Sequence, residues 1–203
     1  MSHYFETPGG AERRHTVSAT IWGRSYAFLS ANGVFSADRL DPGTALLFRY
    51  AAPPANTPAR FLDLGCGFGP IAIALADRCP QATVYAIDTN ERALDLTRDN
   101  ARRHHLADRI IASAPDDVPA GVTFDEIWSN PPIRIGKPAL HDLLDRWLGR
   151  LTPTGRAFLV VGRHLGADSL ATWLTTRGWA VERLGSSAGF RVMTVSSPDS
   201  NRC

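Results

Sequence analysis

The sequence predicts an α/β fold in which a mostly parallel sheet is doubly wound, with helices on both faces. Three observations lead to this class. Short apolar segments alternate with helical segments between residues 60 and 177, which is typical of a parallel sheet covered by helices. A glycine-rich turn, residues 65–69, follows the first apolar segment. The last two apolar segments are joined by only five residues, 185–189, too few for a crossover helix, so these two strands must pair antiparallel.

Length and composition indicate one catalytic domain. With 203 residues and 44% hydrophobic content, the chain can bury one substantial core. No apolar run approaches the roughly 20 residues that cross a bilayer, and no signal-peptide core is present, so we expect a cytoplasmic protein without a membrane partner. The three cysteines, Cys66, Cys79 and Cys203, form no Cys-x-x-Cys pair, which predicts reduced thiols and no metal site. A net charge of +2 is too small to establish a polyanionic partner.

The first fifty residues predict a small β-hairpin and a lead-in helix packed on the core. Residues 15–30 alternate in the strand manner on both sides of Gly23-Arg24, where glycine can open a two-residue turn. Asp41-Pro42 is typical of a helix start, a capping carboxylate followed by proline. The proline-rich stretch 51–58 then leads into the main domain, residues 51–203.

In the main domain the elements are predicted in order. We expect strands at Arg60–Leu64, Thr83–Asp88, Arg109–Ser113, Glu126–Ser129 and Arg156–Val161, and tail strands at Ala180–Leu184 and Arg191–Val195. Helices are expected at Pro70–Asp77, Glu91–His104, Pro138–Leu151 and Ala167–Arg177.

Two acidic residues flank the glycine-rich turn. Asp63 precedes the glycines inside the strand end, where a carboxylate suits a ligand that carries an amine better than a pyrophosphate. Asp88 ends the next strand, where an acidic side chain can accept hydrogen bonds from both hydroxyls of a ribose. A turn without function, and a cap for the helix near Glu91, are the plain alternatives for the glycines and for Asp88.

Together these residues carry a resemblance. The segment Asp63-Leu-Gly-Cys-Gly-Phe-Gly69 and the strand end at Asp88 resemble the first two motifs of class I S-adenosylmethionine-dependent methyltransferases. Ser129-Asn130-Pro131-Pro132 resembles their fourth motif, in the form that amino-group methyltransferases use. The match is closest to the "methyltransferase small" family, which includes bacterial enzymes that methylate guanine N2 of 16S ribosomal RNA. It extends over residues 33–44, the central motifs, residues 130–137 and residues 189–192.

The resemblance implies a Rossmann-like, seven-stranded sheet whose last strand is antiparallel, with S-adenosylmethionine as cofactor and S-adenosylhomocysteine as product. The cofactor-binding residues that it implies are Asp63, Gly65, Cys66, Gly67, Gly69, Asp88, Thr89, Ser113, Ala114 and Asn130. Relatives often have an acidic or polar residue after the third strand, where this chain has Ala114. Asp116 or a backbone group is the alternative contact for the adenine amine.

The Asn-Pro-Pro element also has a physical rationale of its own. The two prolines fix φ and lack N–H groups, so the carbonyls of Asn130 and Pro131 stay stiff and free to accept hydrogen bonds. With the Asn130 amide oxygen they can take the hydrogens of a planar NH2 group and direct its lone pair at a methyl group. A rigid turn at a strand end is the structural alternative.

The residues after the prolines predict a substrate contact. Relatives that methylate adenine or protein glutamine typically have an aromatic residue where this chain has Ile133, which we group with Asn130, Pro131 and Pro132 as catalytic. Arg134 and Lys137 are the candidates for a phosphate contact. A second basic cluster lies along residues 98–109 and is more typical of a solvated helix face.

The leading hypothesis is therefore an N-methyltransferase that acts on the exocyclic N2 amine of a guanine in small-subunit ribosomal RNA, with this RNA or the small ribosomal subunit as partner. Methylation of a protein glutamine or a small-molecule amine is the second hypothesis, because the same carbonyl cage accepts any planar NH2. A third, from another class, is a module that binds the cofactor or RNA without turnover. The sequence leaves the oligomeric state open.

Overall fold

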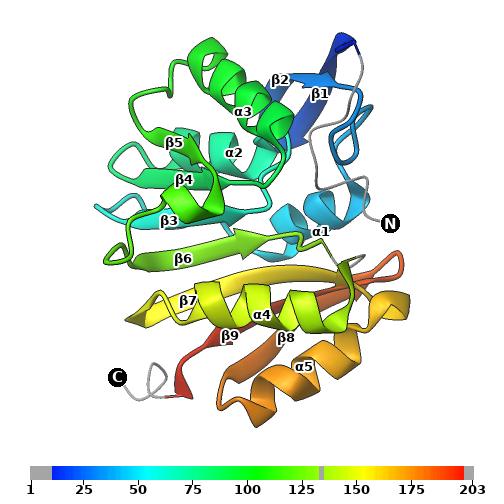
Figure 1. The fold of residues 1–203 in the computed structure, drawn as a ribbon, viewed down its shortest axis with the longest axis vertical. Helices are drawn as coiled ribbons and strands as arrows, with labels where there is room; N and C mark the ends of the chain where they lie inside the picture. Colours follow the sequence, from blue (N-terminus) through cyan, green and yellow to red (C-terminus); the bar gives the residue numbers. More distant parts are fainter. Residues whose placement is uncertain (1–10, 133–134, 199–203) are drawn as a thin grey trace.

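The computed structural model describes residues 11–132 and 135–198 (Figure 1). The strands are β1 Arg14–Ile21, β2 Arg24–Ala31, β3 Arg60–Leu64, β4 Thr83–Ile87, β5 Ile110–Ser113, β6 Phe124–Ser129, β7 Leu151–Gly162, β8 Ala180–Ser187 and β9 Phe190–Ser196. The α-helices are α1 Pro42–Tyr50, α2 Pro70–Arg78, α3 Glu91–Arg103, α4 Lys137–Leu148 and α5 Ala167–Thr176, and two short 3-10 helices are η1 Pro115–Asp117 and η3 Arg163–Leu165.

Seven strands form one sheet in the order β5-β4-β3-β6-β7-β9-β8. The pairs β3–β4, β3–β6, β4–β5 and β6–β7 are parallel, whereas β9 pairs antiparallel with both β7 and β8. The predicted Rossmann-like sheet with an antiparallel last strand is therefore confirmed. The strand order reverses between β3 and β6, and ligands bind at such a switch point in open α/β sheets.

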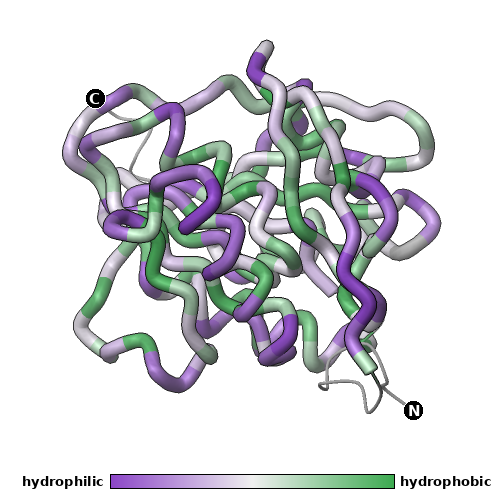
Figure 2. The backbone as a smooth tube through the Cα atoms, turned by 90° about the horizontal axis from the view of Figure 1, so that it is seen from above, coloured by the Kyte–Doolittle hydropathy of each residue, from purple (hydrophilic) through white to green (hydrophobic). Residues whose placement is uncertain are grey.

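Helices cover both faces of this sheet. The helices α1, α2 and α3 and the β1–β2 hairpin pack on one face, around residues such as Phe61, Trp128 and Phe158. On the opposite face α4 and α5 pack over Leu62, Ile127 and other alternate residues of the same strands. Figure 2 shows that hydrophilic and hydrophobic stretches alternate along the backbone. The carboxyl edge of the sheet is left for a ligand site.

The N-terminal hairpin is confirmed, but its turn lies one residue earlier than predicted. Ile21 pairs with Arg24, so the turn residues are Trp22 and Gly23, both with positive φ. A two-residue hairpin turn of this kind needs positive φ at both positions, and glycine supplies the second. Trp22 tolerates its strained backbone because its indole N–H donates to the carbonyls of Phe48 and Ala51.

Several boundaries of the main domain differ from the prediction, most of them by one or two residues, and β7 begins at Leu151 instead of Arg156. Helix α4 ends at Leu148, because Gly149 and Arg150 close its last turn, and Leu151 already pairs with Phe124 in the sheet. The segment 185–189 was expected to be a loop, yet β8 continues to Ser187 across an irregular pairing at Gly185. A Cβ at Gly185 would collide with the Tyr50 ring of α1, so this glycine permits close packing rather than a turn.

No helix in the described part of the chain is long and apolar enough to span a membrane.

Candidate active site

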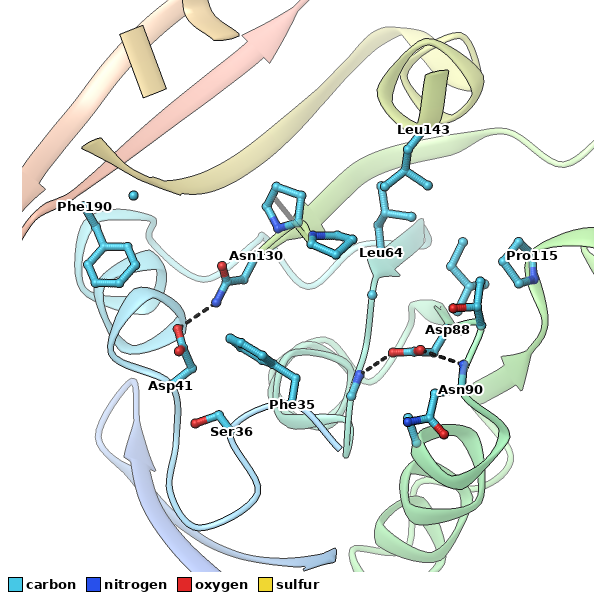
Figure 3. A pocket seen from close by; sticks show the side chains of 18 residues that line it. Phe35, Ser36, Asp41, Leu64, Asp88, Asn90, Pro115, Asn130, Leu143 and Phe190 are labelled. Carbon is cyan, nitrogen blue, oxygen red and sulfur yellow. Dashed lines mark hydrogen bonds between the residues drawn. The ribbon is translucent and has the colours of Figure 1, made fainter. Parts of the chain in front are cut away.

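A cavity of about 360 Å³ opens at the carboxyl edge of the sheet, where the strand order reverses. This volume lies within the range of small-molecule sites, about 300–1,000 Å³. Segments from the whole chain contribute to its wall (Figure 3): Phe35, Ser36, Asp41, Leu64, Gly65, Gly67, Ile87, Asp88, Thr89, Asn90, Ala93, Pro115, Asn130, Pro131, Pro132, Leu143, Gly162 and Phe190.

The glycine-rich turn forms one wall of the cavity. Gly65, Gly67 and Gly69 all have positive φ, which favours glycine. A Cβ at Gly65 or Gly67 would find almost no neighbour, so at these positions the backbone itself faces the cavity. A Cβ at Gly69 would lie 2.9 Å from the Thr97 hydroxyl oxygen, and this glycine caps α2 behind the wall. The turn therefore exposes bare backbone to the cavity at two of its three glycines, and contact with a cofactor there stays a prediction.

Asp88 ties this turn to the next strand. Its Oδ2 accepts a hydrogen bond from the Gly67 N–H at 3.0 Å, and its Oδ1 accepts one from the Asn90 N–H at 2.9 Å. Burial raises the pKa of Asp88 above its ordinary value, and these backbone hydrogen bonds oppose that shift. The cap of α3 is Asn90 rather than Asp88, so the capping alternative for Asp88 is wrong. The carboxylate lines the cavity next to Thr89.

Asp63 and Cys66 lie behind the wall instead of on it. Asp63 is fully buried, and its Oδ2 accepts a hydrogen bond from the Ala72 N–H of α2 at 2.9 Å. Its Oδ1 has no hydrogen-bond partner among the described residues. Burial raises the pKa of Asp63 to about 8, and the nearby Asp88 adds to the shift. The Cys66 thiol packs 3.5 Å from the Thr97 hydroxyl, and burial raises its pKa well above the ordinary value.

The opposite wall is built around Asn130, at the end of β6. The Ser129 hydroxyl donates to the Leu64 carbonyl at 2.7 Å, which joins the ends of β6 and β3. The Asn130 amide nitrogen donates to Asp41 Oδ1 at 2.7 Å and to the Thr44 hydroxyl oxygen at 3.1 Å (Figure 3). Both N–H groups of the amide are thus occupied, and the amide oxygen is the atom left to accept a hydrogen bond from a ligand.

Asp41 performs two tasks with one oxygen atom. Its Oδ1 also accepts hydrogen bonds from the backbone N–H groups of Gly43 and Thr44, as the N-cap of α1. The sequence indicated the cap but not the contact with Asn130, which lies 89 positions further along the chain. Asp41 therefore links the start of the lead-in helix to the orientation of the Asn130 amide.

Several other wall residues were missed from the sequence. Phe35 and Ser36 come from the loop after the hairpin, and Phe190 begins β9. The only signal available was that residues 33–44 and 189–192 took part in the family resemblance, without a role for any single side chain. Leu64, Ile87, Ala93, Pro115 and Leu143 give the cavity an apolar lining.

Other predicted site residues lie elsewhere. Ser113 and Ala114 do not line the cavity; the neighbouring Pro115 does, at the start of η1, whereas Asp116 is exposed and pairs with Arg146. Lys137 is exposed at the first turn of α4 and is likewise absent from the wall. Ile133 and Arg134 lie outside the described residues. Among the described residues no group of three or more His, Cys, Asp or Glu side chains is placed to hold a metal.

Comparison with known proteins identifies the family. Residues 25–194 match the family model described as "Methyltransferase small domain". The chain belongs to this family. It is therefore an S-adenosylmethionine-dependent methyltransferase, in accord with the Rossmann-like sheet and the glycine-lined cavity.

Relatives within the family differ in length. The chain is 32% identical to the uncharacterized Bacillus subtilis protein YbxB, over 82% of this chain and 84% of that protein. It is 31% identical to a ribosomal RNA large subunit methyltransferase G of Alcanivorax borkumensis and 34% identical to a ribosomal RNA small subunit methyltransferase C of Klebsiella pneumoniae. Those matches cover 82% and 63% of this chain, but only 43% and 38% of the relatives' own length.

Among solved structures, the fold is similar to a T. thermophilus 16S rRNA N2 methyltransferase in complex with AdoMet and guanosine. The TM-score is 0.79 at 24% identity, over 94% of this chain and 52% of that chain.

Proposed function

We propose that this family member methylates the exocyclic N2 amine of a guanine in small-subunit ribosomal RNA. The observation that carries the proposal is the fixed Asn130 amide: Asp41 and Thr44 hold its nitrogen, so its oxygen is presented to an N–H donor. An acceptor amine can donate one N–H to this oxygen and keep a second N–H for another partner, whereas a hydroxyl acceptor has only one proton to donate. The names of the ribosomal RNA methyltransferases among the relatives support an RNA substrate.

The cofactor fits along the glycine wall. Gly65 and Gly67 allow close approach to the backbone, and Asp88 can accept hydrogen bonds from the ribose hydroxyls through the lone pairs that its backbone partners leave unused. Pro115 and Ile87 provide apolar surface beside the expected adenine position. Asp63 supports the wall from behind, through its hydrogen bond with the Ala72 N–H of α2, and does not contact the cavity itself.

When bound, S-adenosylmethionine supplies an electrophilic methyl group. Asn130 Oδ1 accepts one N–H of the acceptor amine, and the neighbouring backbone carbonyls of Asn130 and Pro131 are suited to accept the other. The nitrogen lone pair would then point at the methyl carbon for an in-line displacement. The N–C bond would form as the S–C bond breaks, S-adenosylhomocysteine would leave, and the methylated nitrogen would release one proton to solvent. Orientation is the main source of rate in such an arrangement.

Incubation of the protein with methyl-labelled cofactor and ribosomal subunits tests the proposal, provided the subunits come from cells that lack this gene. Nucleoside analysis of the labelled RNA should yield N2-methylguanosine. Label confined to protein or to small molecules would defeat the proposal and favour the second hypothesis. Cofactor binding without any transfer would favour a binding module.

A further inference from the structure

We propose that Phe35 and Phe190 are the two aromatic walls of a slot that holds the acceptor base after it has left its stack. This inference rests on the proposed function and deepens it, because it selects a planar aromatic acceptor. Ile133, which follows the prolines, has no ring on which a base can stack. Two other parts of the chain provide rings instead.

Phe35 is unusually exposed for its size. The residue is 52% exposed, and Ile111 is the only other large hydrophobic residue that is exposed in the described part of the chain. Phe35 lines the cavity beside Ser36, and Ile111 on β5 does not. Single exposed apolar residues are common and need no explanation. An exposed aromatic ring in the wall of a ligand cavity, however, presents a face that a planar ligand can cover.

Phe190 is held in place on the other side of Asn130. It is half-buried and pairs with Gly162 across β9 and β7, and both residues line the cavity. A Cβ at Gly43 would lie 3.0 Å from a carbon of the Phe190 ring, so the missing side chain of Gly43 makes room for this ring. In Figure 3 the two phenylalanines lie on either side of the hydrogen bond between Asp41 and Asn130.

The combination of rings and amide selects a chemical class. A heterocycle stacks on aromatic rings through its faces while its exocyclic amine, in the plane of the ring, reaches the oxygen of Asn130. A protein glutamine or an aliphatic amine offers the N–H groups but no aromatic face. The slot therefore favours a nucleobase over the acceptors of the second hypothesis, and a base inside a duplex cannot enter it without flipping.

To test the slot, the full chain is saturated with S-adenosylhomocysteine and titrated with free guanosine. NMR measures the binding of guanosine. Loss of base–aromatic stacking should weaken guanosine binding about fivefold to a hundredfold in Phe35→Ala and in Phe190→Ala. Phe35→Tyr should retain most of the affinity because it keeps the ring. Ile111→Ala is the matched control, an exposed apolar residue outside the cavity, and should bind guanosine like the parent protein.

The outcomes separate the slot from the proposed acceptor. If another nucleoside binds in place of guanosine with the same dependence on Phe35 and Phe190, the slot stands and guanine is the wrong base. Unchanged guanosine affinity in both alanine variants would overturn the slot, as would failure of the parent protein to bind any nucleoside. An equal loss of S-adenosylhomocysteine affinity in Phe35→Ala would place this ring in the cofactor pocket and would also overturn it.

Discussion

The two walls of the cavity each depend on an aspartate, but the two carboxylates do different work. Asp88, on the glycine wall, accepts hydrogen bonds from the backbone of Gly67 and Asn90, so it fixes the course of the chain. Asp41, on the opposite wall, adds a side-chain partner, Asn130, to its backbone contacts and so fixes the direction of a functional group. Changes on the glycine wall should therefore affect cofactor binding, and changes on the Asn130 wall should affect turnover.

Asn130→Ala should cause the largest effect. Without the amide, the acceptor amine loses its fixed partner, and misplacement by about 1 Å can cost about a hundredfold in rate. We expect kcat to fall by at least that factor, while the affinity for S-adenosylmethionine changes little. Steady-state kinetics measure kcat, and calorimetry measures the affinity for S-adenosylmethionine. Near-normal turnover in this variant would indicate that Asn130-Pro131-Pro132 is only a rigid turn without a role in the transfer.

Asp88→Ala should show the reverse pattern. A charge-assisted pair of hydrogen bonds to a ribose contributes about 1.5–3 kcal/mol, so the Kd for S-adenosylmethionine and S-adenosylhomocysteine should rise roughly tenfold to a hundredfold. At saturating cofactor kcat should stay closer to that of the parent protein. Unchanged cofactor affinity in the folded variant, measured by calorimetry, would remove Asp88 from the cofactor site.

Asp41→Ser separates the two tasks of Asp41. Serine is a good N-cap, so α1 should keep its start, but its shorter side chain cannot reach the Asn130 amide. We expect kcat to fall about tenfold, in line with the loss of one charge-assisted hydrogen bond, with little change in the midpoint of thermal unfolding. Asp41→Asn retains an oxygen at the same place and should restore much of the rate. If the Asp41→Ser and Asp41→Asn variants are equally slow, Asp41 does not act by orienting the Asn130 amide.

The same contrast explains which parts of the site were predictable. The glycine wall is made by residues close together in sequence, from 63 to 69, and by Asp88 at the end of the adjacent strand, so a motif describes it. The Asn130 wall is assembled from Phe35, Asp41 and Phe190, which meet only after the chain has folded. A pattern of residues holds no information on which distant carboxylate will accept a hydrogen bond from the Asn130 amide nitrogen.

Fold prediction was limited for a similar reason. Hydrophobic periodicity predicted every strand and α-helix of the main domain, because each of these elements has one or two buried faces, but it did not predict the 3-10 helices η1 and η3. It failed where a glycine serves a tertiary contact: Gly185 resembled a loop residue, yet it lies in β8 against Tyr50. The hairpin turn was misplaced because Trp22 adopts a positive φ that its own sequence neighbours do not indicate.

Asp63→Asn should remove a pH dependence of stability. Burial raises the pKa of Asp63 to about 8, above the value of an unfolded aspartate, about 4. Between these values the folded protein without cofactor binds one proton more than the unfolded chain, so its free energy of unfolding should fall as pH rises, by up to about 1.4 kcal/mol per pH unit. Urea unfolding from pH 5 to 8 measures this slope. If the Asp63→Asn variant shows the same slope of unfolding free energy against pH, other groups cause the pH dependence.

The smallest expected effects concern two basic surfaces. On α3, two arginines pair with carboxylates: Arg98 lies 2.8 Å from both Glu91 and Asp95, and Arg102 lies 2.5 Å from Asp99. Lys137 lies on α4, the helix that contributes Leu143 to the cavity wall, and Arg163 begins η3. Both are exposed, and no carboxylate among the described residues pairs with them. Arg163 directly follows Gly162 of the cavity wall, and its backbone N–H donates to the Gly189 carbonyl next to Phe190.

Unpaired cations beside a base slot suit the phosphates that flank the acceptor nucleotide, whereas paired arginines are already neutralised. Lys137→Gln and Arg163→Gln should each weaken binding to small-subunit ribosomal RNA roughly threefold and lower the slope of log affinity against log salt by about 0.7, as expected for one phosphate contact on single-stranded RNA. Arg98→Gln and Arg102→Gln are the matched controls and should change neither quantity. Filter binding at several salt concentrations, with S-adenosylhomocysteine present, measures both. If the α3 variants weaken RNA binding as much as the Lys137 and Arg163 variants, carboxylate pairing does not distinguish the two surfaces, and the RNA must also contact α3.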